Sequence, residues 1–135
     1  MSSRVVIYEP ACTEDRPLTE SLAGQGFVLV PCNDAKTVLE EVVQGHADAL
    51  VFALCDQNGP ETELGLLRLV RRAAADLPLV LLARDDSLAV RRELQYFNPI
   101  YYAVWPPDPI ELREAVCAAV LKTSRHRVVS AKRAV

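Results

Sequence analysis

The chain has 135 residues, half of them hydrophobic, which suits one domain with a sizeable core. No apolar run approaches the roughly 20 residues that a membrane-spanning helix requires, and the N-terminal Met-Ser-Ser-Arg leads into a strand pattern without the architecture of a signal peptide. We therefore expect a cytoplasmic location. The four cysteines show no CxxC spacing and no paired pattern, so in that reducing compartment we expect free thiols.

Charge is unevenly distributed along the chain. The whole chain carries −3, and residues 122–135 hold five bases and no acid, which leaves −8 on residues 1–121. An acidic body does not suit a nucleic-acid-binding domain, whose basic patch lies on the folded face. We expect a folded domain over residues 1–121 and a basic C-terminal tail or linker over 122–135. The alternative for the tail is a contact arm for nucleic acid or an acidic partner.

Strand-like and helix-like segments alternate from end to end. Apolar runs predict five strands, at residues 4–8, 27–30, 49–54, 78–83 and 100–104. Helical spacing and helix-end signals predict five helices, at about residues 15–23, 34–44, 61–75, 87–96 and 108–122. The alternation favours a parallel sheet with helices on both faces.

Two of the predicted helices carry clear start signals. Asn33 or Asp34 caps the second helix, which Gly45 ends. Asp108, Pro109 and Glu111 form a capping-box pattern at the start of the last helix, which we expect to end near residue 122 with Cys117 in the core.

Five such strand–helix units admit few topologies. Right-handed crossovers and helices on both faces predict a flavodoxin-like, doubly wound α/β sheet with the strand order 2-1-3-4-5. In such a sheet, ligands bind at the carboxyl ends of the strands. Those ends carry Ala53, Ala83 and Trp105, which cannot transfer protons, bind a hard metal or hold a phosphoryl group. We therefore expect a protein that binds rather than an enzyme, with no cofactor and no metal.

The C-terminal third carries the most specific pattern. It reads Asn98-Pro-Ile-Tyr-Tyr-Ala-Val-Trp-Pro-Pro-Asp-Pro-Ile-Glu-Leu112. Over residues 4–121 the chain resembles the receiver domain of bacterial two-component response regulators, the CheY-like family. The resemblance implies that Tyr102 is the switch aromatic and that the peptide bond before Pro106 is cis. Asn98 stands where the family has glycine, and Asn is a non-glycine residue suited to positive φ.

The resemblance also shows where the chain departs from a working receiver. The acidic pair that holds Mg²⁺ is reduced to Glu9 followed by Pro10, the phosphoryl acceptor position falls on Ala53, the Thr or Ser position on Ala83, and the Lys position on Trp105. Glu9 alone is a poor Mg²⁺ site. Without the metal and the lysine, nothing neutralises the charge on a transferring phosphoryl group.

The alignment after the third strand leaves an alternative open. A loop about two residues longer than usual places the acceptor position on Cys55, and Asp56 follows as a displaced acceptor. The missing lysine and hydroxyl weigh against phosphorylation in either alignment.

The resemblance thus implies a degenerate receiver, or pseudo-receiver, that acts in signal transduction or transcription regulation through phosphorylation-independent protein contacts. The partner is a protein or a second copy, bound through the fourth helix, fifth strand and fifth helix. A C-terminal effector domain outside this sequence is also implied. The candidate switch and interface residues are Tyr101, Tyr102, Trp105, Arg91 and Arg113.

Two other functions remain open on the same fold. Cys12, Cys32 and Cys55 all follow strand ends, which is compatible with a thiol redox or soft-metal sensor. Trp105 in an emptied pocket is compatible with a small-ligand sensor.

Overall fold

The computed structural model describes residues 3–8, 17–54, 60–83, 88–104 and 107–133. Its five strands are β1 (Arg4–Tyr8), β2 (Val28–Cys32), β3 (Ala49–Leu54), β4 (Leu79–Ala83) and β5 (Tyr101–Val104). Its helices are α1 (Pro17–Leu22), α2 (Ala35–Val43), α3 (Pro60–Ala73), α4 (Leu88–Gln95) and α5 (Pro109–Arg133). All strand pairs are parallel, in the order β2-β1-β3-β4-β5, which confirms the predicted fold class.

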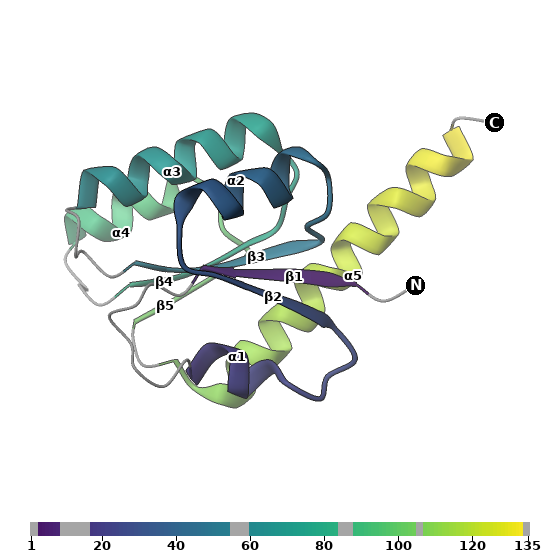
Figure 1. The fold of residues 1–135 in the computed structure, drawn as a ribbon, viewed down its shortest axis with the longest axis horizontal. Coiled ribbons are helices and arrows are strands. Elements are labelled where there is room, and N and C mark those ends of the chain that lie inside the picture. Colours follow the sequence, from purple (N-terminus) through teal and green to yellow (C-terminus); the bar gives the residue numbers. More distant parts are fainter. Residues whose placement is uncertain (1–2, 9–16, 55–59, 84–87, 105–106, 134–135) are drawn as a thin grey trace.

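The sheet lies between two layers of helices (Figure 1). Helices α2, α3 and α4 cover one face, and α1 and α5 cover the other. Side chains alternate between the faces, as a pleated strand requires. Leu50 and Phe52 of β3 join the cluster under α2, α3 and α4, whereas Val51 and Ala53 join the cluster under α1 and α5.

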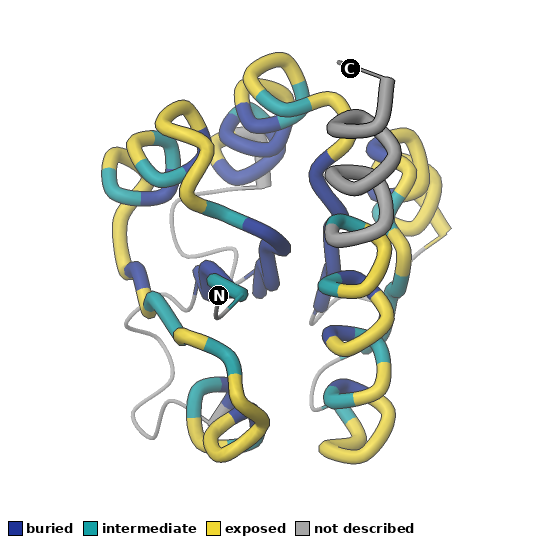
Figure 2. The backbone as a smooth tube through the Cα atoms, turned by 90° about the vertical axis from the view of Figure 1, so that its right-hand side faces the viewer, coloured by how far each residue is buried: buried dark blue, intermediate teal, exposed yellow. Residues whose placement is uncertain are grey.

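The central strands are buried over their whole length. Every residue of β3 and of β4 is buried, as expected for parallel strands covered on both faces. Figure 2 shows this buried sheet between helices whose outer sides are exposed. The core therefore consists of two apolar clusters, one on each face of the sheet.

Capping and turn residues lie where the sequence predicts them, at both ends of α2, at the start of α5 and after α4. The Asp34 side chain accepts a hydrogen bond from the backbone N–H of Thr37 (2.7 Å) and caps α2, and Asp108 accepts from the N–H of Ile110 (2.8 Å) at the start of α5. Gly45 (φ 74°) follows the end of α2. Asn98 has φ 54°, the left-handed conformation expected for a residue that replaces glycine.

The sequence-based expectations were wrong for β2 and α5. β2 runs through Pro31 to Cys32 instead of ending at residue 30; Pro31 is tolerated because β2 is an edge strand, which does not need every backbone N–H. α5 continues to Arg133 instead of ending near residue 122. Residues 122–133 contain neither Gly nor Pro, so nothing in the sequence breaks the helix there.

Cys117 is also placed differently from expectation. It is exposed, because Leu112, Val116 and Ala119 form the buried side of α5 and position 117 falls on the other side. Within the described ranges, no helix is long and apolar enough to span a membrane.

Candidate functional site

The candidate site is the carboxyl edge of the sheet, where ligands bind in this architecture. Tyr8 ends β1, Ala53 and Leu54 end β3, and Ala83 ends β4. Ala53 lies opposite Leu82, and Leu54 lies opposite Ala83, so these residues form neighbouring positions at one edge. The register of the strands brings these positions together.

The two alanines present buried methyl groups at this edge. Ala53 is 6% exposed and belongs to the cluster under α1 and α5, whereas Ala83 is 1% exposed and belongs to the cluster under α2, α3 and α4. A methyl group can neither accept a phosphoryl group nor coordinate a cation. At both positions the side chain contributes to packing on its own face of the sheet.

An aromatic pair occupies the end of β1. The rings of Tyr8 and Phe52 stack with centroids 4.5 Å apart and planes 16° from parallel. Burial, followed by the negative charges of Glu63 and Asp34, raises the pKa of the Tyr8 phenol. The phenol is therefore neutral at physiological pH, and it cannot serve as an anionic ligand there.

Cys32 is the candidate redox residue that the structure describes. Its Sγ donates to the carbonyl oxygen of Val30 at 3.6 Å, and the side chain is buried at the end of β2. Burial, then the charges of Glu41 and Asp34, raise the pKa of the thiol to about 11. Reactive cysteines have lowered pKa values, so the surroundings of Cys32 do not favour a thiol sensor.

The switch and interface candidates separate onto two faces. Tyr102 is half-buried and packs against the cluster under α2, α3 and α4. Arg91 belongs to α4, on the same face of the sheet, and is exposed. Tyr101 faces α5, and its hydroxyl donates to Glu111 Oε2 at 3.0 Å. Burial and this hydrogen bond to Glu111, with the charges of Glu111 and Asp108, raise the pKa of Tyr101. Arg113, on α5, donates from Nε to the Pro109 carbonyl at 3.3 Å.

Several predicted site residues lie outside the described residues. These are Glu9, Pro10, Cys12, Cys55, Asp56, Trp105 and Pro106. The residual acid, the displaced acceptor, the cis-proline and two of the three candidate redox cysteines therefore stay predictions. Within the described ranges, no group of three His, Cys, Asp or Glu side chains has a geometry that could hold a metal ion.

Sequence reasoning missed Glu63, a buried acid near this edge. It lies on α3 and is 4% exposed, with a polar interaction of its own. Its signal was its position four residues before Leu67 and seven before Val70, which puts it on the apolar side of the predicted helix. Among the described residues near this edge there is thus a buried acid, Glu63, which the family pattern did not lead us to expect.

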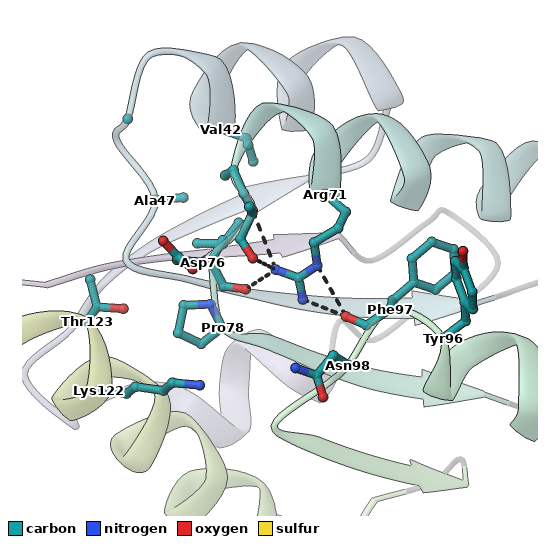
Figure 3. Close-up of a pocket in the computed structure, with 14 residues that line it drawn as sticks. Val42, Ala47, Arg71, Asp76, Pro78, Tyr96, Phe97, Asn98, Lys122 and Thr123 are labelled. Atoms are coloured by element: carbon teal, nitrogen blue, oxygen red, sulfur yellow. Dashed lines mark hydrogen bonds between the residues drawn. The ribbon is translucent and has the colours of Figure 1, made fainter. Parts of the chain in front are cut away.

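A pocket of about 760 Å³ lies at the opposite, amino edge of the sheet (Figure 3). Arg71 of α3 forms one wall. Its Nη2 and Nε donate to the Phe97 carbonyl oxygen (2.6 and 3.2 Å), and its Nη1 donates to the carbonyls of Leu77 (2.8 Å) and Ala75 (2.9 Å). One guanidinium therefore joins the end of α3 to the loop before β4 and to the loop before β5.

Helix α5 is held to the same edge. The Thr123 hydroxyl donates to the Asp48 carbonyl oxygen at 2.7 Å, and Asp48 Oδ2 accepts from the backbone N–H of Arg4 at 2.8 Å. These contacts tie α5 to the starts of β1 and β3. Sequence reasoning did not identify them, because their partners are mostly backbone groups that only the tertiary fold brings together.

The proteins that resemble this chain share its fold at low sequence identity. No protein-family model and no curated protein matches this sequence. Among solved structures, a CheY-like response regulator receiver domain protein from Methanospirillum hungatei JF-1 superposes with a TM-score of 0.79 at 13% identity, over 93% of this chain and 99% of that one. The signal receiver domain of an HD domain-containing protein from Pseudomonas fluorescens Pf-5 gives 0.77 at 18% identity, over 93% and 99%.

A longer protein contains the same fold as one part. NtrX from Brucella abortus matches with a TM-score of 0.78 at 14% identity, over 98% of this chain but only 29% of that chain. The strand order, the helices on both faces and these superpositions agree. The chain has the fold of CheY-like response regulator receiver domains.

Proposed function

We propose that this chain is a pseudo-receiver: a signalling module that keeps the receiver fold and acts through protein contacts without accepting a phosphoryl group. The observation that carries the proposal is the pair of buried methyl groups at Ala53 and Ala83, on adjacent strands at the edge where a receiver carries out its chemistry. Phosphoryl transfer needs a nucleophilic oxygen and positive charge that neutralises the phosphoryl group. Neither alanine supplies a nucleophilic oxygen or a positive charge.

The aromatic stack supports the same proposal. Tyr8 and Phe52 fill the space beside the end of β1 with apolar rings, and the Tyr8 phenol is held neutral. Mg²⁺ prefers anionic or carbonyl oxygen ligands in octahedral geometry. A packed, neutral aromatic pair at this position favours a structural role for the strand end.

The partner is a protein that recognises the surface of α4, β5 and α5, or a second copy of this chain. Arg91 is exposed on α4, and Arg113 lies half-buried on α5, so each of these two helices carries a basic residue that a partner could contact. The match to part of the longer Brucella abortus NtrX chain supports a place for such a domain within a larger regulator.

The test is intact-mass spectrometry after incubation with Mg²⁺ and acetyl phosphate. The proposal predicts no phosphoryl adduct on the natural chain or on the Asp56→Asn variant. An adduct on the natural chain that disappears in Asp56→Asn would identify a displaced acceptor and overturn the proposal. An adduct that persists in Asp56→Asn would overturn it as well, because another residue would then carry the phosphoryl group.

A further inference from the structure

The pocket at the amino edge of the sheet is large enough to hold a small molecule. Its volume of about 760 Å³ falls within the range of roughly 300–1,000 Å³ that is typical of small-ligand sites. The turns before β3, β4 and β5 line it, together with Lys122 and Thr123 of α5. Its described lining includes none of the residues at the carboxyl edge, so it is separate from the edge that carries the chemistry of a working receiver.

The walls of the pocket are mostly apolar. Val42, Leu77, Pro78 and Phe97 line it and are buried. Tyr96 also lines it, is 89% exposed, and meets Phe97 edge-on with ring centroids 6.3 Å apart. Figure 3 shows the two rings together at one end of the pocket. An exposed aromatic ring beside buried apolar walls offers a contact surface for the apolar part of a ligand.

Two polar side chains in the pocket have donors that are not used. Within the described ranges, neither the Lys122 amine nor the side-chain amide of Asn98 makes a hydrogen bond or an ion pair. Figure 3 shows both side chains on the same side of Pro78, with the Lys122 amine directed toward Asn98. An ammonium and an amide nitrogen both supply N–H donors, and the ammonium adds a positive charge. This pair therefore suits an anion.

The other charged groups in the pocket limit how much negative charge it can hold. Arg71 donates to four backbone carbonyls, so its donors hold the wall, and its charge interacts with that of Asp76. Arg71, Asp76 and Lys122 together give the lining a net charge of +1. One net positive charge suits a carboxylate, whereas the nearly two negative charges of a phosphate monoester would be repelled by Asp76.

We propose that the amino-edge pocket binds a small organic monocarboxylate with an apolar body. Lys122 and Asn98 donate to the carboxylate, and the buried walls and Tyr96 cover the apolar body. Because Lys122 belongs to α5, the ligand joins α5 to the turns before β4 and β5. The site does not rest on the proposed absence of phosphorylation, because the residues at the carboxyl edge take no part in it.

The first test titrates the ¹⁵N-labelled chain with probes that separate the charge from the apolar body. Naphthoate and octanoate are monocarboxylates, naphthyl phosphate carries more negative charge, naphthalenemethanol has no charge, and acetate has no apolar body. We expect saturable amide shifts at Ala75, Asn98 and Thr123 with naphthoate or octanoate. The alcohol, the phosphate and acetate should bind at least about fivefold more weakly.

Three results of this titration would overturn the proposal. The first is that neither monocarboxylate produces saturable shifts at the amino edge. The second is that the saturable shifts lie at Leu54 and Ala83, which would place the site at the opposite edge. The third is that the alcohol or the phosphate binds as tightly as naphthoate, because the pocket would then not select a monocarboxylate.

The second test removes the ammonium group. Lys122→Met keeps an unbranched side chain without the charge, and we expect it to weaken naphthoate binding about fivefold. Lys36→Met on α2 is the matched control, because Lys36 is an exposed lysine that does not line the pocket. It should leave the affinity unchanged. Unchanged affinity in Lys122→Met, or an equal loss in Lys36→Met, contradicts a carboxylate site at Lys122.

The third test removes the amide of Asn98 without changing the backbone. Asn98 has φ 54°, a left-handed conformation that glycine adopts without strain, so Asn98→Gly deletes only the side chain. We expect about fivefold weaker binding of naphthoate, because one donor to the carboxylate is lost. Circular dichroism confirms that the variant is folded. Unchanged affinity in Asn98→Gly would show that Asn98 serves only the turn and would overturn its assignment to the site.

Discussion

The two edges of the sheet are built from opposite kinds of contact. At the amino edge, Arg71, Asp48 and Thr123 tie loops and helix ends together through hydrogen bonds to backbone groups. At the carboxyl edge, Ala53 and the stacked pair of Tyr8 and Phe52 fill space with apolar atoms. Among the described residues, the ends of β1 and β3 are packed with apolar side chains at the carboxyl edge, whereas several hydrogen bonds to backbone groups join the elements at the amino edge.

The largest effect on stability is expected when packing is removed from the carboxyl edge, which tests whether this edge is part of the core. Phe52→Ala deletes a fully buried ring and its stacking on Tyr8, and we expect a loss of about 3–5 kcal/mol in the free energy of unfolding. Urea denaturation followed by circular dichroism measures this. Phe52→Leu, which keeps most of the volume, should cost less than half as much. A loss below about 1 kcal/mol for Phe52→Ala would show that this edge is not packed core.

At the amino edge the corresponding change is Arg71→Ala. It removes the guanidinium that donates to the carbonyls of Ala75, Leu77 and Phe97, and it leaves these acceptors to find other donors. We expect a loss of about 3 kcal/mol, measured in the same way. Arg71→Lys keeps the charge but loses the fork of donors, so it should recover only part of the loss. Full recovery in Arg71→Lys would mean that charge, not hydrogen bonding, ties this edge.

Restoring an acid at the family's acceptor position sharpens the contrast. Ala53→Asp places a carboxylate among the apolar residues under α1 and α5, and we expect a loss of about 2 kcal/mol. The uncharged Ala53→Asn separates the cost of charge from the cost of size. If Mg²⁺ raises the melting temperature of Ala53→Asp but not of Ala53→Asn, the edge has kept a functional cation site, contrary to the account.

The smallest expected effect is a pH dependence from Cys32. Its folded-state pKa is raised to about 11, from 9.0 for an ordinary thiol. The unfolded chain therefore loses this proton first, so the contribution of the thiol to stability is complete below about pH 9 and is lost as the pH rises toward 11. Cys32→Ala should reduce the fall in unfolding free energy between pH 9 and 11. An identical fall in the variant would assign it to other groups.

The sequence predicted the fold because local and long-range signals agree. Apolar runs mark the strands, and caps such as Asp34 and Asp108 mark helix starts, so the alternation leaves few topologies. The sequence also placed Ala53 and Ala83 at the carboxyl ends of their strands, where the structure has them. These predictions needed only the pattern of residue types along the chain.

Other features were not predicted from the sequence. Some depend on tertiary contacts, and for others the pattern in α5 was interpreted wrongly. The role of Arg71 has no sequence signature, because its acceptors are the backbone carbonyls of Ala74, Ala75, Leu77 and Phe97, which only the fold brings together. The end of α5 was placed too early because a run of bases was interpreted as a tail, although no helix-breaking residue follows Lys122. Cys117 was placed in the core although the helical period through Leu112 and Val116 puts it on the outer side.

The most direct measurement of the central claim is a titration of ¹⁵N-labelled protein with Mg²⁺ and beryllofluoride, followed by amide NMR spectra. Beryllofluoride mimics a bound phosphoryl group, and its binding would shift amides at the carboxyl ends of β1, β3 and β4. The account predicts that the amides of Tyr8, Leu54 and Ala83 do not move beyond the change that Mg²⁺ alone produces. Saturable shifts at these residues that require beryllofluoride would contradict it.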